Sequence, residues 1–207
     1  MTMTGPLPRL VVFVSGSGTN LQAILDAITS GSLRAEVRLV VSNRKAAFGL
    51  TRASQAGIPT LYFPLKPYTD AGLSRETYDR DLAERVSELN PNLLVLAGWM
   101  HVFTPDFLDR FPNLVINLHP ALPGQFAGTD AIRRTYDAYQ KGEVSMGGCM
   151  VHYVVSAVDA GAVIAQAVVP IEPSDSLETF EAHLHNAEHD LIVEAIRSVL
   201  RQRDLAS

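Results

Sequence analysis

The sequence has one cysteine, Cys149, among its 207 residues, which excludes an intramolecular disulfide. It also lacks an apolar run long enough to cross a bilayer, and its first ten residues lack the charged and apolar regions of a secretory signal. These absences predict a cytoplasmic protein without a membrane partner. Basic residues are in deficit, with 17 Lys and Arg against 22 Asp and Glu, and the formal net charge is −5. Because binding to a phosphate backbone requires clustered Lys and Arg, nucleic acid is not an expected partner, and small-molecule chemistry fits better.

No stretch rich in Ser, Gly and Pro and no low-complexity run divides the chain. A chain of this length suffices for one α/β domain with a sizeable core. We therefore predict a single domain over residues 1–207, in which residues 1–8 form a flexible tail. None of these patterns bears on oligomeric state, so a homodimer stays open.

Short runs of branched apolar residues alternate with segments of helical periodicity. The runs expected to form strands are residues 10–14, 38–41, 60–63, 93–96 and 114–117. The expected helices run from about residue 20 to Gly31, over 46–55, from a cap at Ser74, over 131–139 and over 177–200. Strands 149–155 and 163–168 are joined by a connection too short for a crossover helix, so they should pair antiparallel.

This order predicts an α/β fold with a doubly wound, mostly parallel sheet and an antiparallel strand near its C-terminal end. Ligands of such sheets bind beyond the carboxyl ends of the strands. We therefore expect the site at loops 15–20, 98–102 and 117–128, together with the turn that contains Asp159.

The loop at residues 15–20 reads S-G-S-G-T-N and joins the first strand to the first helix. Glycines there let backbone N–H groups close on an anion at the positive end of the helix. A dinucleotide fingerprint would need a third glycine where Leu21 stands, and a Walker loop would need Gly-Lys-Ser/Thr. The loop therefore predicts a site for a small phosphorylated ligand, although a bare structural turn gives the same pattern.

Asn117 and His119 lie two residues apart at the end of a buried strand, so their side chains should point the same way. An amide donor and an imidazole can together stabilise an oxyanion, and the imidazole can relay a proton, as acyl transfer requires. Asp159 could favour and orient a protonated His119. A structural His119 and an Asp159 that serves only its own turn stay open.

The remaining histidines and the cysteine are weaker candidates. Residues 185–189 match H-x-x-E-H, but a zinc site would need a further acidic ligand well downstream, so no metal is expected. His185 shares a helix face with Glu188, which leaves a polar ligand contact open beside a solvated face. His152 is interpreted as a packed strand residue, and Cys149 as buried filler.

The motifs SGSGTNLQAIL, LAGWM, INLHPALPG, GCMVHYV and VDAGAVIAQA occur in this order over nearly the whole chain. Together they resemble the folate-dependent glycinamide ribonucleotide formyltransferases of purine synthesis. The resemblance implies a Rossmann-like formyltransferase fold and transfer of formyl from 10-formyltetrahydrofolate, as cosubstrate, to the amine of 5-phosphoribosylglycinamide. The products would be the N-formyl ribonucleotide and tetrahydrofolate.

Site residues follow from the resemblance position by position. Asn117, His119 and Asp159 would be catalytic. The phosphate and ribose would be bound by Gly18, Thr19, Asn20, His185 and Glu188. The folate would be bound by Arg75, Met100, His101, Val102, Phe103, Val155, Ser156, Ala157 and Val158.

The sequence departs from the commonest bacterial form in three places. His101 stands where many members have arginine, residues 121–124 read Ala-Leu-Pro-Gly, and Ala162 replaces a frequent proline. These changes resemble a form seen in some fungi. Rival functions are formyltetrahydrofolate hydrolysis, which in that family follows an extra N-terminal domain, initiator-tRNA formylation, which uses an added C-terminal domain, and non-catalytic binding of nucleotide phosphates.

Overall fold

The computed structural model describes residues 5–206, and the side chains of residues 5–203. The expected flexible tail lies partly outside this range, at residues 1–4. Seven strands and seven helices occur in the described chain. In chain order they are β1 Arg9–Val14, α1 Thr19–Thr29, β2 Glu36–Ser42, α2 Phe48–Gln55, β3 Thr60–Tyr62, α3 Lys66–Asp70, α4 Arg75–Ser87, β4 Leu93–Leu96, α5 Pro105–Leu108, β5 Val115–His119, α6 Ala131–Gln140, β6 Met146–Tyr153, β7 Val163–Pro170 and α7 Leu177–Ala206.

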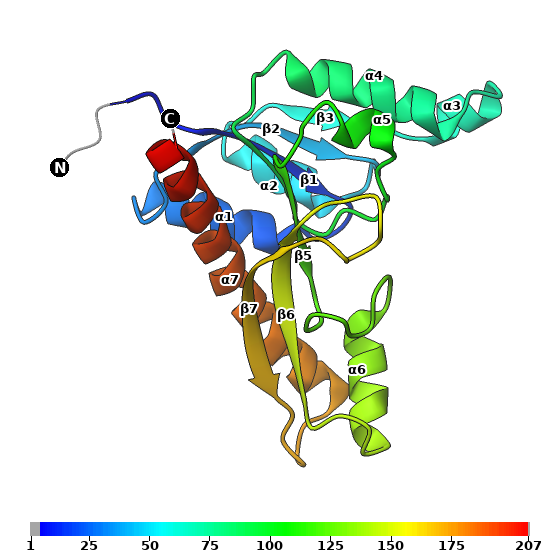
Figure 1. Cartoon of the computed structure of the whole chain (residues 1–207), viewed down its shortest axis with the longest axis vertical. Coiled ribbons are helices and arrows are strands. Elements are labelled where there is room, and N and C mark those ends of the chain that lie inside the picture. Colours follow the sequence, from blue (N-terminus) through cyan, green and yellow to red (C-terminus); the bar gives the residue numbers. More distant parts are fainter. Residues whose placement is uncertain (1–4, 207) are drawn as a thin grey trace.

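The seven strands form one sheet in the order β3-β2-β1-β4-β5-β6-β7 (Figure 1). Strands β1 to β5 pair in parallel, whereas β6 is antiparallel to both β5 and β7. The predicted doubly wound sheet and its antiparallel pair are therefore confirmed. The central strands β1, β4 and β5 are buried on both faces, which explains why they read as continuous apolar runs.

Alternate residues of β1 enter two separate cores, because successive side chains on a strand point to opposite faces. Leu10, Val12 and Val14 pack with α1 and α7, whereas Val11 and Phe13 pack with α4 and α5. Figure 1 shows α1 and α7 on one side of the sheet and α3, α4 and α5 on the other. The two cores therefore lie on opposite faces of one sheet.

No helix in the described chain is long and apolar enough to cross a membrane.

Three local features differ from the sequence predictions. Helices α3 and α5 were not predicted, because segments of five and four residues are too short to show a helical period. Strand β6 begins at Met146 and ends at Tyr153, so its predicted range of 149–155 was wrong at both ends.

Glycines hide the true start of β6, because glycine is normally depleted in strands. A Cβ at Gly147 would lie 2.4 Å from the Phe180 ring, and one at Gly148 would lie 2.3 Å from the carbonyl oxygen of Ala167. The close packing of α7 and β7 on β6 therefore requires glycine at these strand positions.

Candidate active site

A cleft of about 560 Å³ lies at the predicted edge of the sheet. It is lined by the glycine loop, the segment after β4, the end of β5, the Asp159 turn and one face of α7. A larger and more open hollow of about 1040 Å³ between α1 and α7 includes none of the three predicted catalytic residues. The smaller cleft is the candidate site, because convergent polar groups distinguish binding sites better than size does.

The glycine loop closes tightly on the start of α2. Gly18 has a φ of 71°, in the left-handed region, and is the N-cap residue of α1. A Cβ at Gly18 would lie 2.6 Å from the Cα of Gly49, and the N–H of Gly49 donates to the carbonyl oxygen of Gly16. These contacts hold the loop at the N-terminus of α1, where free N–H groups favour an anion.

Replacing Gly18 by alanine is expected to lower the free energy of unfolding by about 1–3 kcal/mol, since both the positive φ and the contact with Gly49 oppose a Cβ. Urea denaturation measures this change. Gly16→Ala is the matched control, because Gly16 has no left-handed φ and a Cβ there has no neighbour within 4 Å. Equal losses in the two variants would contradict this account of the loop.

The last helix contributes a polar group beside the glycine loop. Glu188 is only 4% exposed, and its Oε2 lies 2.8 Å from Nδ1 of His185 and 3.4 Å from Nδ2 of Asn20. The hydrogen bond to Glu188 raises the pKa of His185, although burial acts in the opposite direction. Oδ1 of Asn20 is buried without a partner in the described chain. Gly18 and Thr19, together with these three residues, line the cleft, and their binding of phosphate and ribose stays a prediction.

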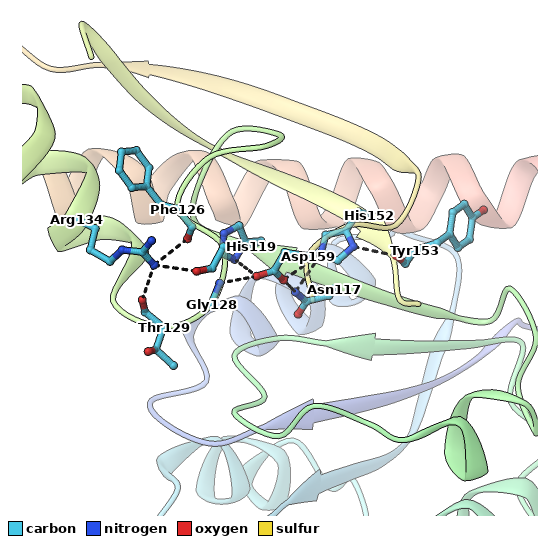
Figure 2. A network of polar contacts seen from close by, with 10 residues as sticks. Asn117, His119, Phe126, Gly128, Thr129, Arg134, His152, Tyr153 and Asp159 are labelled. Carbon is cyan, nitrogen blue, oxygen red and sulfur yellow. Dashed lines mark hydrogen bonds and ion pairs between the residues drawn. The ribbon is translucent and has the colours of Figure 1, made fainter. Parts of the chain in front are cut away.

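Asp159 joins the predicted catalytic residues into one cluster (Figure 2). Its Oδ2 lies 3.3 Å from Nδ1 of His119, and its Oδ1 lies 3.4 Å from Nδ2 of Asn117. The backbone N–H of Gly128 donates to the same Oδ2 at 2.9 Å. Asn117 and His119 thus reach one carboxylate from the same side of β5, as the strand period predicted.

His152 also belongs to this cluster, and the sequence interpretation missed this. Its Nδ1 lies 2.8 Å from the carbonyl oxygen of Tyr153, and its Nε2 lies 3.2 Å from Nδ2 of Asn117 and 3.5 Å from Oδ1 of Asp159. His152 is directly opposite Asn117 in the β5–β6 ladder. It is indeed a buried, hydrogen-bonded strand residue, but it also lines the cleft. Only the register of β6 against β5 would have revealed it, and that register is not local in sequence.

The charge balance of the cluster differs from the expectation. Burial lowers the pKa of His119, and the opposing effects of Asp159 and of the carbonyl groups of Gln125 and Phe126 do not compensate. Asp159 itself raises the pKa of His119, which is the predicted direction, but burial is the larger effect. Burial alone would raise the pKa of Asp159, but contacts with His152, Gly128 and His119 lower it overall. The two pKa shifts thus favour a neutral imidazole beside an ionised carboxylate.

The other end of the cleft is largely apolar. Met100, Val102, Val155 and Val158 line it and are each between 45% and 56% exposed. Phe103 also borders the cleft but is only 3% exposed, because its ring packs against Phe13 and Phe107 in the core.

His101 lines the same end, between the rings of Tyr78 and Trp99. Burial, with the nearby Arg75 and Arg44, lowers the pKa of His101 to about 4. The structure therefore has a neutral imidazole at this position. Among the described residues that line this cleft, Arg44 is the only Lys or Arg, and it was not predicted from the sequence.

Three predicted folate residues lie outside the cleft lining. The guanidinium of Arg75 donates to the carbonyl oxygen of Val102 at 2.6 Å and pairs with Asp79. Arg75 therefore stabilises the segment after β4 without lining the cleft. Ser156 and Ala157 are exposed, whereas the valines on either side of them line the cleft.

Two sequence features remain, the single cysteine and the H-x-x-E-H match at residues 185–189. Cys149 is fully buried, and burial raises the pKa of its thiol to about 12. No group of three or more His, Cys, Asp and Glu side chains within the described residues is arranged to hold a metal ion.

A doubly wound sheet with an amide, an imidazole and a carboxylate converging at its edge defines an enzyme of the acyl-transfer class. More particularly, the chain belongs to the formyl transferase family, whose sequence model matches residues 8–196.

Similar proteins extend over most of this chain. It is 47% identical to the phosphoribosylglycinamide formyltransferase of Schizosaccharomyces pombe over 199 residues, which is 92% of this chain and 96% of that protein. It is 42% identical to the enzyme of the same name from Dictyostelium discoideum, over 91% of this chain and 96% of that one. The crystal structure of glycinamide ribonucleotide transformylase 1 from Symbiobacterium toebii superposes with a TM-score of 0.86 at 39% identity, over 95% of this chain and 89% of that one.

Proposed function

We propose that this enzyme transfers the formyl group of 10-formyltetrahydrofolate to the amine of 5-phosphoribosylglycinamide, a step of purine biosynthesis. The observation that carries the proposal is that one cleft contains both an anion loop and the Asn117, His119 and Asp159 cluster. A phosphorylated substrate held by the loop would present its other end to the cluster. Loops and helices of one sheet supply both parts of the site.

The ribonucleotide side uses the glycine loop and α7. The free N–H groups at the start of α1 bind the phosphate, with Gly18, Thr19 and Asn20 forming the turn. Glu188 accepts hydrogen bonds from ribose hydroxyls, and its buried carboxylate is already oriented by His185 and Asn20. The hydrogen bond to Glu188 raises the pKa of His185, which favours positive charge next to this end of the cleft.

The apolar end fits a flat aromatic cosubstrate. Its valine and methionine side chains offer a surface for a ring system, and Nε1 of Trp99 and Nδ1 of His101 are buried polar atoms without a partner in the described chain. Unpaired buried polar atoms are costly, so a bound molecule that satisfies them gains affinity. When bound, the formyl folate supplies the electrophilic carbon and receives the proton that leaves the amine.

His119 is proposed as the proton-transfer group. In a neutral imidazole whose Nδ1 carries its proton toward Asp159, the lone pair is on Nε2. Nε2 is buried and has no hydrogen-bond partner among the described residues, so an attacking amine that reached it would supply the missing one. As the amine bonds to the formyl carbon, Nε2 takes its proton, and Asp159 at 3.3 Å stabilises the imidazolium that forms.

Asn117 and the imidazolium of His119 then stabilise the negative charge on the formyl oxygen. The amide of Asn117 and the protonated Nε2 of His119 donate to that oxygen as negative charge develops on it. When the carbon–nitrogen bond to the folate breaks, the proton on His119 passes to the departing nitrogen. His119 ends neutral, so the cycle balances.

The test of the function is an absorbance assay for the tetrahydrofolate product, with glycinamide ribonucleotide present or omitted. We expect turnover only when the amine is present. Equal turnover without the amine would identify a hydrolase, and binding of both ligands without turnover would identify a binder. Either result would overturn the proposal.

A further inference from the structure

Arg134 lies on the second turn of α6 and forms several backbone contacts beside the catalytic cluster (Figure 2). We infer that Arg134 is a positioning residue that holds segment 126–129 against Asp159 and thereby sets the protonation of His119. The inference rests on the proposed function only for its kinetic consequence, since the contacts themselves can be tested in the protein alone.

The guanidinium of Arg134 gathers the carbonyl groups of one short segment. Its Nη1 donates to the carbonyl oxygens of Ala127 at 2.8 Å, Thr129 at 3.3 Å and Phe126 at 3.4 Å. Its Cζ also lies 5.7 Å from the centre of the Phe126 ring. All three contacts use the same Nη1, so its two N–H groups are shared among three carbonyl oxygens, and the contact with Ala127 is the shortest.

The same segment is strained, so it needs such support. Phe126 and Asp130 have φ values of 45° and 55°, in the left-handed region that non-glycine residues rarely adopt. Residues in such conformations persist only when surrounding contacts outweigh their cost. Arg134, on α6, supplies such contacts to carbonyl groups of this interval.

Gly128, in the middle of the segment, links Arg134 to the reaction. Its neighbours on both sides are held by Arg134, and its own N–H donates to Oδ2 of Asp159 at 2.9 Å. That oxygen is the one that lies 3.3 Å from Nδ1 of His119. If the segment moved, Asp159 would lose the donor that fixes its position and one of the contacts that lower its pKa.

The groups that face Asp159 come from three elements. They are His119 and Asn117 from β5, His152 from β6, and the backbone N–H of Gly128. Without Gly128, the pKa of Asp159 should rise. A less firmly held carboxylate also supports the imidazolium less, so the pKa of His119 should fall further below its ordinary value.

The test compares Arg134→Ala with Arg133→Ala. Arg133 is the adjacent exposed residue on α6, and its side chain has no hydrogen bond, ion pair or ring contact in the described structure, so both variants lose the same charge from the same helix. We expect Arg134→Ala to lower kcat by about 10- to 100-fold and to move the acid limb of the kcat profile to lower pH. Arg133→Ala should change neither, and Arg134→Lys should recover only part of the loss.

Measurements on the protein alone separate this inference from the function. In Arg134→Ala, nuclear magnetic resonance should show faster amide exchange at Gly128, a higher titration midpoint for Asp159 and a lower one for His119. These shifts would support the positioning role even if wild-type protein proved inactive with the amine. Unchanged exchange and midpoints in Arg134→Ala, or equal changes in Arg133→Ala, would overturn it.

Discussion

Replacing His119 by alanine is expected to lower kcat by about 10²- to 10⁴-fold while KM for both substrates changes little. Such a loss is typical when a positioned acid–base group is removed. The imidazole acts on atoms that change during the reaction, so its removal should affect the transition state more than the bound substrates. Steady-state assays of tetrahydrofolate formation, with the amine at saturation, measure the effect.

His183→Ala is the control for this variant. His183 lies on the same polypeptide but outside the cleft, with its side chain 51% exposed and 3.9 Å from Asp175. It should keep wild-type kcat. Near-normal turnover by folded His119→Ala protein, judged from its unfolding curve, would remove His119 from the proposed mechanism.

Replacing Asp159 by asparagine is expected to lower kcat by about 10²-fold or more, because the imidazolium of His119 would lose its stabilising charge. Asparagine has nearly the same shape, and it tolerates the φ of 51° found at this position, so the turn should persist. Since Asp159 raises the pKa of His119, the substitution should lower that pKa further. The residual activity should then extend to lower pH, which a kcat profile measures.

The pH dependence of stability gives a second observation on the same variant. The folded-state pKa of Asp159 is lowered, so its carboxylate stabilises the fold above the unfolded-state pKa, and this contribution is lost as pH falls through the folded-state value. Asp159→Asn should therefore lack that part of the acid-induced loss of stability.

Asp130→Asn is the matched control for both readouts. Asp130 also has a positive φ and also lines the cleft, yet it makes no hydrogen bond or ion pair with His119 or His152 in the described structure. Its substitution removes the same charge without touching the proposed proton relay. Equal effects of the two substitutions on kcat and its pH profile would mean that general cleft charge, rather than the Asp159–His119 contact, is responsible.

Local periodicity was enough to predict most of the fold. Buried strands and amphipathic helices leave their period in the sequence, and Ser74 caps α4 as predicted, since its hydroxyl accepts from the N–H of Thr77. Strand period also placed Asn117 and His119 on one side. The start of β6 was not predicted, because glycine has a low strand propensity. Gly147 and Gly148 are needed there because a Cβ would clash with the ring of Phe180 and the backbone of β7.

The sequence by itself thus determined the strands and helices of the doubly wound sheet, the glycine loop and the shared direction of Asn117 and His119, all of which depend on residues close together along the chain. Only the tertiary structure decided that His152 joins the cluster, that Arg134 contacts the segment around Gly128, and that burial outweighs Asp159 in its effect on the pKa of His119. The physical reason is that register, desolvation and carbonyl contacts arise from segments that meet only after folding. The balance between burial and Asp159 at His119 depends on how closely those segments pack, which no local pattern records.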